Sequence, residues 1–156
     1  MAMVIEGEER IEAPIQKVWE ALNDPEILKA CIPGCESLDK ASDTEMSAVV
    51  ALKVGPIKAR FNGHVELVNL NPPHSYTIQG EGKGGIAGFA KGGADVVLKE
   101  DGPDATILTY AAKADVGGKM AQLGSRLITS TSKKLAGEFF SSFNAKVSGA
   151  QADASV

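Results

Sequence analysis

The fold is indicated first by the segment GGKMAQLGSRLI, residues 117–128, which begins the one long helix that the sequence predicts. The preceding region alternates apolar and polar residues as strands do. Apolar residues then recur at three- and four-residue spacing along one side of the helix: Met120, Leu123, Leu127, Thr131, Leu135, Phe139 and Phe143. Such a helix must pack on the preceding sheet. Because Ala121 and Gly124 lie beside the apolar stripe, we expect packing gaps and an internal cavity between helix and sheet.

The alternation between residues 46 and 114 predicts half-buried antiparallel strands. The inward parity holds Met46, Ala48, Val50, Leu52, Val54, Ile57, Ala59, Phe61, Gly63, Val65, Leu67, Tyr76, Ile78, Gly80, Gly82, Ala90, Gly92, Ala94, Val96, Leu98, Leu108, Tyr110, Ala112 and Ala114. The intervening residues Lys58, Arg60, Asn62, His64 and Glu66 are polar and are expected to face water. With a first strand at residues 4–11, the chain predicts about seven strands.

Two short helices are predicted between the first and second strands. Ala13-Pro14 begins the first one, because the missing N–H of a proline costs little in the first turn. Asn23-Asp24-Pro25 ends this helix and caps the second, at residues 26–30. Ile32-Pro33-Gly34 then ends the second helix.

This order of elements predicts an α+β helix-grip fold, in which a curved seven-stranded antiparallel sheet wraps around a long C-terminal helix. We expect one domain at residues 1–147 and a disordered tail of small and polar residues at 148–156. Glycines crowd two adjacent strands and are expected to let the sheet bend and leave room for a ligand: Gly80, Gly82, Gly84, Gly85, Gly88, Gly92 and Gly93.

Composition and charge exclude several classes of protein. A chain of 156 residues with 44% hydrophobic content can bury a core without disulfides or a metal. Its net charge of −4 argues against nucleic-acid binding. No apolar run approaches the roughly 20 residues that span a bilayer. The acidic start lacks the pattern of a secretory signal, so we expect a cytoplasmic protein.

The charge is unevenly distributed. Residues 119–146 carry five cations and one anion, so this helix is at +4 and the remainder of the chain is at −8. At about 100° per residue, Lys119, Arg126 and Lys133 fall within roughly 40° on one flank of the helix. We expect this basic line to dock on anionic lipid or on an acidic patch of a partner protein, with simple solvation of the helix as the alternative.

Three motifs suggest chemistry but fit bland interpretations better. Cys31 and Cys35 have a C-x3-C spacing without further ligands, so we predict two reduced thiols and no metal site. Residues 80–85 formally match the dinucleotide fingerprint, but no helix follows them, so we assign them to a hairpin. His64 and His74 have no apparent partner for catalysis.

Several segments resemble the CoxG family, the family of the G subunit of carbon monoxide dehydrogenase. They are Ala13-Pro14 with Val18-Trp19, LNDPE at 22–26, CIPGCE at 31–36, Val54-Gly55-Pro56, and the segment at 117–128. The resemblance covers roughly residues 3–147. It implies membership of the START-like (SRPBCC) superfamily, whose members hold apolar ligands between sheet and helix.

The resemblance also implies a function. It suggests a non-catalytic accessory protein of a molybdenum hydroxylase of the carbon monoxide dehydrogenase type, which binds a quinone-like apolar cofactor non-covalently and helps recruit the oxidase to the inner face of the cell membrane. We expect the cavity mouth between the short helices and the start of the long one. The expected ligand contacts are Leu28, Ile32, Phe61, Tyr76, Ala94, Tyr110, Ala112, Met120, Leu123, Gly124, Leu127 and Thr131.

Two other classes stay open from the residues alone. An enzyme of the same superfamily, such as a cyclase or hydrolase, needs an acid or base in the cavity, and only Tyr76 and Tyr110 are polar candidates on inward strands. A structural adaptor with an empty cavity, or a general lipid-binding protein, is the third possibility.

Overall fold

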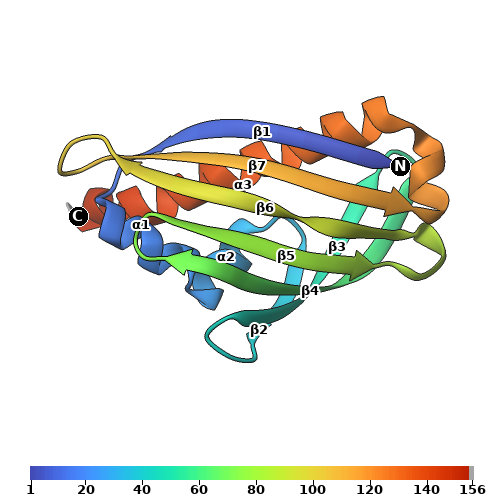
Figure 1. Ribbon diagram of the computed structural model, residues 1–156, viewed down its shortest axis with the longest axis horizontal. Coiled ribbons are helices and arrows are strands. Elements are labelled where there is room, and N and C mark those ends of the chain that lie inside the picture. The colour runs from blue at the N-terminus through green and yellow to red at the C-terminus, as the bar shows by residue number, and fades with distance from the viewer. Residues whose placement is uncertain (155–156) are drawn as a thin grey trace.

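A single curved sheet packs against one long helix (Figure 1). The computed structural model describes residues 1–154, and the side chains of residues 1–148. The elements in chain order are β1 (Ala2–Ile11), α1 (Ile15–Leu22), α2 (Pro25–Cys31), β2 (Cys35–Lys40), β3 (Glu45–Val54), β4 (Ile57–Asn71), β5 (Ser75–Lys83), η1 (Gly85–Ala87), β6 (Phe89–Glu100), β7 (Thr106–Gly117), η2 (Gly118–Leu123) and α3 (Ser125–Ala154).

The seven strands are all antiparallel and follow the order β1-β7-β6-β5-β4-β3-β2. The first strand therefore lies beside the last one, and β2 forms the other edge. The predicted alternation is confirmed: in β4, Phe61 and Leu67 are buried whereas Arg60 and Glu66 are exposed. The sequence prediction of a curved seven-stranded sheet with a final helix is also confirmed.

Glycines in β5 and β6 allow the backbones of neighbouring strands to approach closely. Gly80 lies opposite Gly92 in the register of these two strands. A Cβ atom added at Gly92 would overlap the carbonyl oxygen of Lys113, and one at Gly80 would overlap Val65. These glycines therefore serve the bending of the sheet, as expected. The space beside them is occupied by neighbouring residues and is not open room for a ligand.

The two short helices form where the sequence predicts them. Asp24 caps α2, and its carboxylate accepts a hydrogen bond from the backbone N–H of Glu26 at 2.9 Å. Pro25 occupies the first turn, where its missing N–H leaves no bond unmade. The caps fix the direction of α2, so that Leu28 and Cys31 are buried beneath it.

The expected start of the long helix at Gly117 is wrong. Residues 118–123 form the 3-10 helix η2, and α3 begins only at Ser125. Between them, Gly124 has a φ of +92°, a conformation that side-chain-bearing residues rarely adopt. Gly124 therefore separates two helices, and Lys119, Met120 and Leu123 do not share the periodicity of α3.

The interior divides into two apolar clusters along α3. One lies under α1 and α2 and includes Trp19, Leu108 and Phe143. The other lies at the start of α3 and consists of Val54, Phe61, Ala87, Val116, Met120 and Ile128. The chain is thus one domain with a bipartite core.

The expected tail at residues 148–156 falls almost wholly outside the residues whose side chains are described; only Ser148 is included, and its hydroxyl donates a hydrogen bond to the carbonyl oxygen of Asn144. In the described part of the chain, no helix combines the length and apolar content that a bilayer-spanning segment needs.

Candidate functional site

An apolar cavity of about 360 Å³ lies between the inner face of the sheet, α2 and the second half of α3. This volume is within the range of small-molecule sites. Its wall consists of Leu22, Leu28, Ile32, Leu38, Met46, Ser47, Ala48, Val50, Gly63, Val65, Leu67, Tyr76, Ile78, Val96, Leu108, Phe139 and Phe140. The composition of this wall makes the cavity the best candidate site in the described structure.

Strand alternation and the placement of two helices create this cavity. Met46, Leu67 and Val96 are buried residues on the inner face of the sheet. Leu28 and Ile32 cover them from α2 and its C-terminal end, and Phe139 and Phe140 cover them from α3. No carboxylate, ammonium or imidazole group belongs to the wall as far as the structure is described.

Tyr76 brings the one phenol group into the wall. Only 6% of this residue is exposed, and its ring packs edge-on against Trp19. No described group forms a hydrogen bond with its hydroxyl, which is also absent from the fully enclosed unpaired atoms. The hydroxyl thus has free space in the cavity. Burial raises the pKa of Tyr76, so the phenol is neutral and can donate a hydrogen bond to a ligand.

Aromatic rings of α3 form one side of the cavity. The rings of Phe139 and Phe140 meet edge-on, with centroids 5.0 Å apart, and Tyr110 stacks on Phe140 at 5.4 Å. Tyr110 reaches over Gly7, where an added Cβ would overlap its ring. Burial, and secondarily the charge of Glu9, raise the pKa of Tyr110. Tyr110 therefore supports the aromatic wall from behind.

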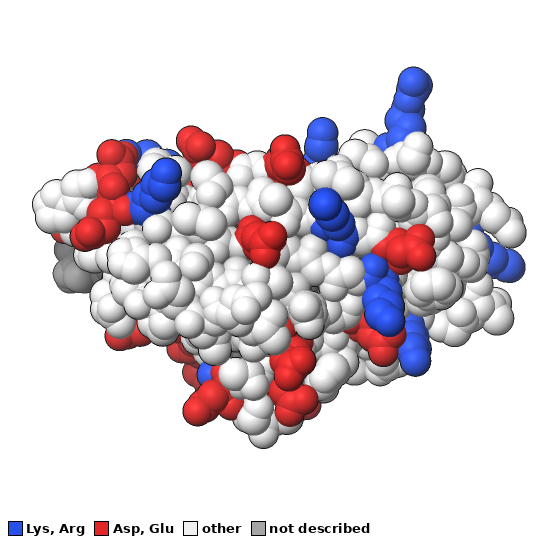
Figure 2. All heavy atoms as spheres, viewed as in Figure 1, with Lys and Arg blue, Asp and Glu red and all other residues white. Residues whose placement is uncertain are grey.

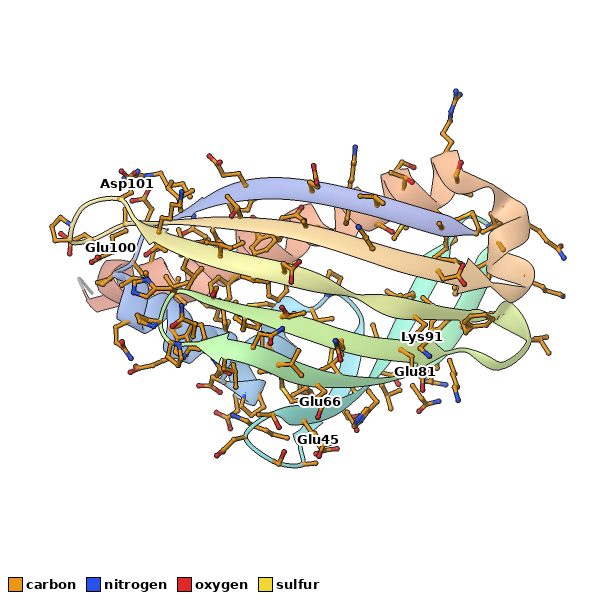
Figure 3. All side chains as sticks on the ribbon, viewed as in Figure 1. Glu45, Glu66, Glu81, Lys91, Glu100 and Asp101 are labelled. Atoms are coloured by element: carbon orange, nitrogen blue, oxygen red, sulfur yellow. The ribbon has the colours of Figure 1, made fainter. Side chains whose placement is uncertain are left out.

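A larger hollow of about 590 Å³ lies on the outer face of the sheet. Its lining includes the charged residues Glu66, Glu81, Lys91 and Asp95, and Figure 3 shows Glu66, Glu81 and Lys91 on that face. Small-molecule sites are mostly apolar and enclosed. The inner cavity fits this description better than the charged outer hollow.

Three of the twelve expected ligand contacts line the cavity. Leu28 and Ile32 come from α2 and its C-terminal end, and Tyr76 comes from β5. Their role in ligand binding stays a prediction, but the structure brings them together.

The other expected contacts lie elsewhere. Phe61, Met120 and Leu123 fill the second apolar cluster. Ala94 and Ala112 face each other across β6 and β7, outside the cavity wall. Parity identified these inner-face residues correctly, but it carries no information on position along the sheet.

The start of α3 contributes no residue to the cavity wall. Leu127 approaches Gly55 in the β3–β4 turn, and Thr131 is half-buried. Gly124 is exposed, and a Cβ added to it would meet nothing within 4 Å. The expectation that a larger side chain at Gly124 would fill the cavity is therefore wrong.

The expected mouth combines residues that the structure separates. Leu28 and Ile32 border the cavity, whereas Met120 and Leu123 belong to the second cluster. The expected basic line is also interrupted, because Lys119 precedes the break at Gly124 while Arg126 and Lys133 lie on α3. All three cations are nevertheless exposed.

Most of the cavity wall was visible in the sequence only as core. Met46, Val65, Leu67, Ile78, Val96 and Leu108 belong to the inward parity. Phe139 belongs to the helical stripe, whereas Leu38 and Phe140 carried no distinguishing signal. Both cysteines are free, with Cys31 buried and Cys35 half-buried. The glycines at 80–85 lie in β5 and the following turn, in agreement with the hairpin prediction.

Comparison with solved structures identifies the fold. A conserved protein from Geobacillus kaustophilus is 28% identical and superposes with a TM-score of 0.88, covering 94% of this chain and 96% of the other. The ZhuI aromatase/cyclase from Streptomyces sp. R1128 is 10% identical, with a TM-score of 0.68 and 94% coverage of both chains. A point mutant of Thalictrum flavum norcoclaurine synthase in complex with a transition-state analogue is 15% identical, with a TM-score of 0.64 and 97% coverage of both. The fold is thus the START-like helix-grip fold.

Comparison with protein families is more specific. A search of curated proteins finds no match. Residues 7–148, which include the whole cavity wall, match the family described as the G subunit of carbon monoxide dehydrogenase (CoxG). This chain therefore belongs to the CoxG family of carbon monoxide dehydrogenase.

Proposed function

We propose that this protein is a non-catalytic accessory protein of a molybdenum hydroxylase of the carbon monoxide dehydrogenase type. It binds a quinone non-covalently in the inner cavity and helps to recruit the oxidase to the inner face of the cell membrane. Family membership supports the accessory role and the partner enzyme. The observation that carries the ligand proposal is the apolar cavity with one unpaired, buried phenol, Tyr76.

The chemistry of a quinone matches this cavity. A quinone ring is flat and apolar on both faces and carries carbonyl oxygens that only accept hydrogen bonds. The neutral hydroxyl of Tyr76 supplies a donor, and Phe139 and Phe140 supply aromatic surface. An unpaired buried hydroxyl is unfavourable, so a ligand that accepts its hydrogen bond gains affinity over an alkane of the same shape.

An enzymatic role has less support in the described residues. General acid–base catalysis works best when the pKa of the group lies near the operating pH. Tyr76 is shifted in the opposite direction, and its nearest aromatic neighbour, Trp19, cannot accept its proton. The structural likeness to two enzymes, at 10% and 15% identity, extends to the fold alone.

Incubation of the purified protein with a lipid extract, followed by repurification and native mass spectrometry, tests the ligand class. We expect quinone to be retained in preference to phospholipid and fatty acid. Retention of all apolar molecules alike would support a general lipid-binding protein, and retention of none would support an adaptor with an empty cavity. Conversion of a retained molecule into a product would support an enzyme.

A further inference from the structure

One end of the molecule combines cations with a protruding apolar side chain. Three segments, residues 52–61, 82–94 and 116–137, contain no aspartate or glutamate. They meet at the second apolar cluster, where β3, β4, η1, β7, η2 and α3 converge. We call this the basic end and define it by its exposed cations Lys53, Lys58, Lys83, Lys119 and Arg126.

These five cations are not neutralised within the described structure. The ion pairs there involve the N-terminal amine, Arg10, Arg60 and His64, and none involves the basic end. Lys53 lies directly opposite Lys58 in the register of β3 and β4. Like charges in that position repel each other. A negative surface at this end would relieve the repulsion.

The hairpin between β5 and β6 presents Ile86 at the tip of this end. Ile86 is 83% exposed, and the neighbouring Phe89 is 43% exposed. The tip is held firmly, because Ala87 is buried in the second cluster and Gly88 approaches Gly118 so closely that neither has room for a side chain. The hairpin therefore projects Ile86 into solvent from a fixed support.

The opposite end of the molecule is acidic. Glu100 and Asp101 lie there at the β6–β7 turn (Figure 3). Figure 2 shows that the charged side chains projecting from the right-hand margin, at the basic end, are blue. A protein with a net charge of −4 would approach an anionic surface with this end first.

We propose that the basic end docks on anionic bilayers, with Ile86 entering the interface and the five cations contacting lipid headgroups. A bilayer fits better than a protein partner because the apolar group is one side chain on a convex tip. A stable protein interface would instead need a broad, complementary apolar core. This inference rests on the proposed membrane recruitment and assigns a surface and a lipid class to it.

Cosedimentation with vesicles tests the assignment. The wild-type protein should bind vesicles of equimolar phosphatidylcholine and phosphatidylglycerol at low salt, bind much less at high salt, and not bind phosphatidylcholine alone. Ile86→Ser should weaken binding about tenfold, as should the triple variant Lys83→Gln, Lys119→Gln, Arg126→Gln. Each changed residue is exposed, so the fold should be retained.

A matched triple variant provides the control. Lys17→Gln, Lys29→Gln and Lys99→Gln change the net charge equally but lie outside the basic end. This control should bind vesicles nearly as well as the wild type. Equal losses in both triple variants, or no binding of anionic vesicles by the wild type, would overturn the inference. So would a basic end needed only for copurification with the hydroxylase. Quinone binding measured in detergent is independent of these outcomes and separates their failure from that of the cavity proposal.

Discussion

The ring of Trp19 stands edge-on to the ring of Tyr76, with centroids 5.4 Å apart and an interplanar angle of 89°. This contact joins α1 to β5 beside the cavity. It holds Tyr76 in a fixed orientation while leaving its hydroxyl without a partner among the described groups. The chain contains no other tryptophan, so Trp19 reports on events at this wall.

Removal of the Tyr76 hydroxyl should separate binding from stability. Tyr76→Phe should weaken quinone affinity by about two- to tenfold, because one hydrogen bond is lost. The free energy of unfolding should be unchanged or slightly higher, since the hydroxyl is buried without a protein partner. Denaturant unfolding and quinone titration of the same samples check both. A large loss of stability would mean that the hydroxyl has a structural role.

The raised pKa of Tyr76 predicts a loss of stability at high pH. Above about pH 10 an unfolded tyrosine releases its proton, whereas the folded Tyr76 keeps it. The folded state then binds more protons than the unfolded state, so stability falls as pH rises, by about 1.4 kcal/mol per pH unit for one such group. Stability is insensitive to this group below that pH. Unfolding curves across this range should show a shallower fall in Tyr76→Phe; parallel falls would contradict the burial effect.

Filling the cavity should weaken ligand binding. Ala48 is half-buried and lines the cavity, so Ala48→Leu should reduce quinone affinity about tenfold or more by occupying the space. Ala111 is also a strand alanine, but it is exposed on the outer face. Ala111→Leu should therefore leave affinity unchanged. Equal effects of both substitutions on titration would place the ligand elsewhere.

Substitution of Gly124 should act through the backbone. The φ of +92° at this residue is unfavourable for any side chain, so Gly124→Ala should destabilise the fold by about 1 kcal/mol or more. The quinone affinity of the folded fraction should not change, because no cavity lies beside Gly124. Denaturant unfolding and binding measurements check the two parts. A selective loss of affinity would restore the start of α3 to the binding site.

Ligand binding should protect α2 from hydrogen exchange. Leu28 and Ile32 border the cavity, and helix ends open more easily than paired strands. Exchange in residues 24–36 should slow when quinone is added. Protection confined to β4–β7 would indicate a different mouth.

Local patterns predicted the architecture because they act over short distances. Alternation placed Met46, Leu67 and Val96 on the inner face correctly, and Asp24-Pro25 marked the second helix. The position of the cavity depends instead on where Phe139 and Phe140 of α3 meet the sheet, which no local pattern specifies.

Glycine accounts for the remaining differences. Gly124 looked like a gap within a helix but is a break between two helices. Gly92 looked like room for a ligand, but the carbonyl oxygen of Lys113 occupies that space. In both cases the sequence identifies a missing side chain, whereas only the structure shows whether the backbone conformation, another chain segment or a ligand requires it.

Titration of Trp19 fluorescence with decylubiquinone tests the central claim most directly, because Trp19 packs against Tyr76 at the cavity wall. The account predicts saturable quenching with one quinone per chain. Affinity should be lower in Tyr76→Phe and Ala48→Leu and unchanged in Ala111→Leu. Quenching that does not saturate, or that has the same affinity in all four proteins, would contradict the claim that this cavity holds the quinone.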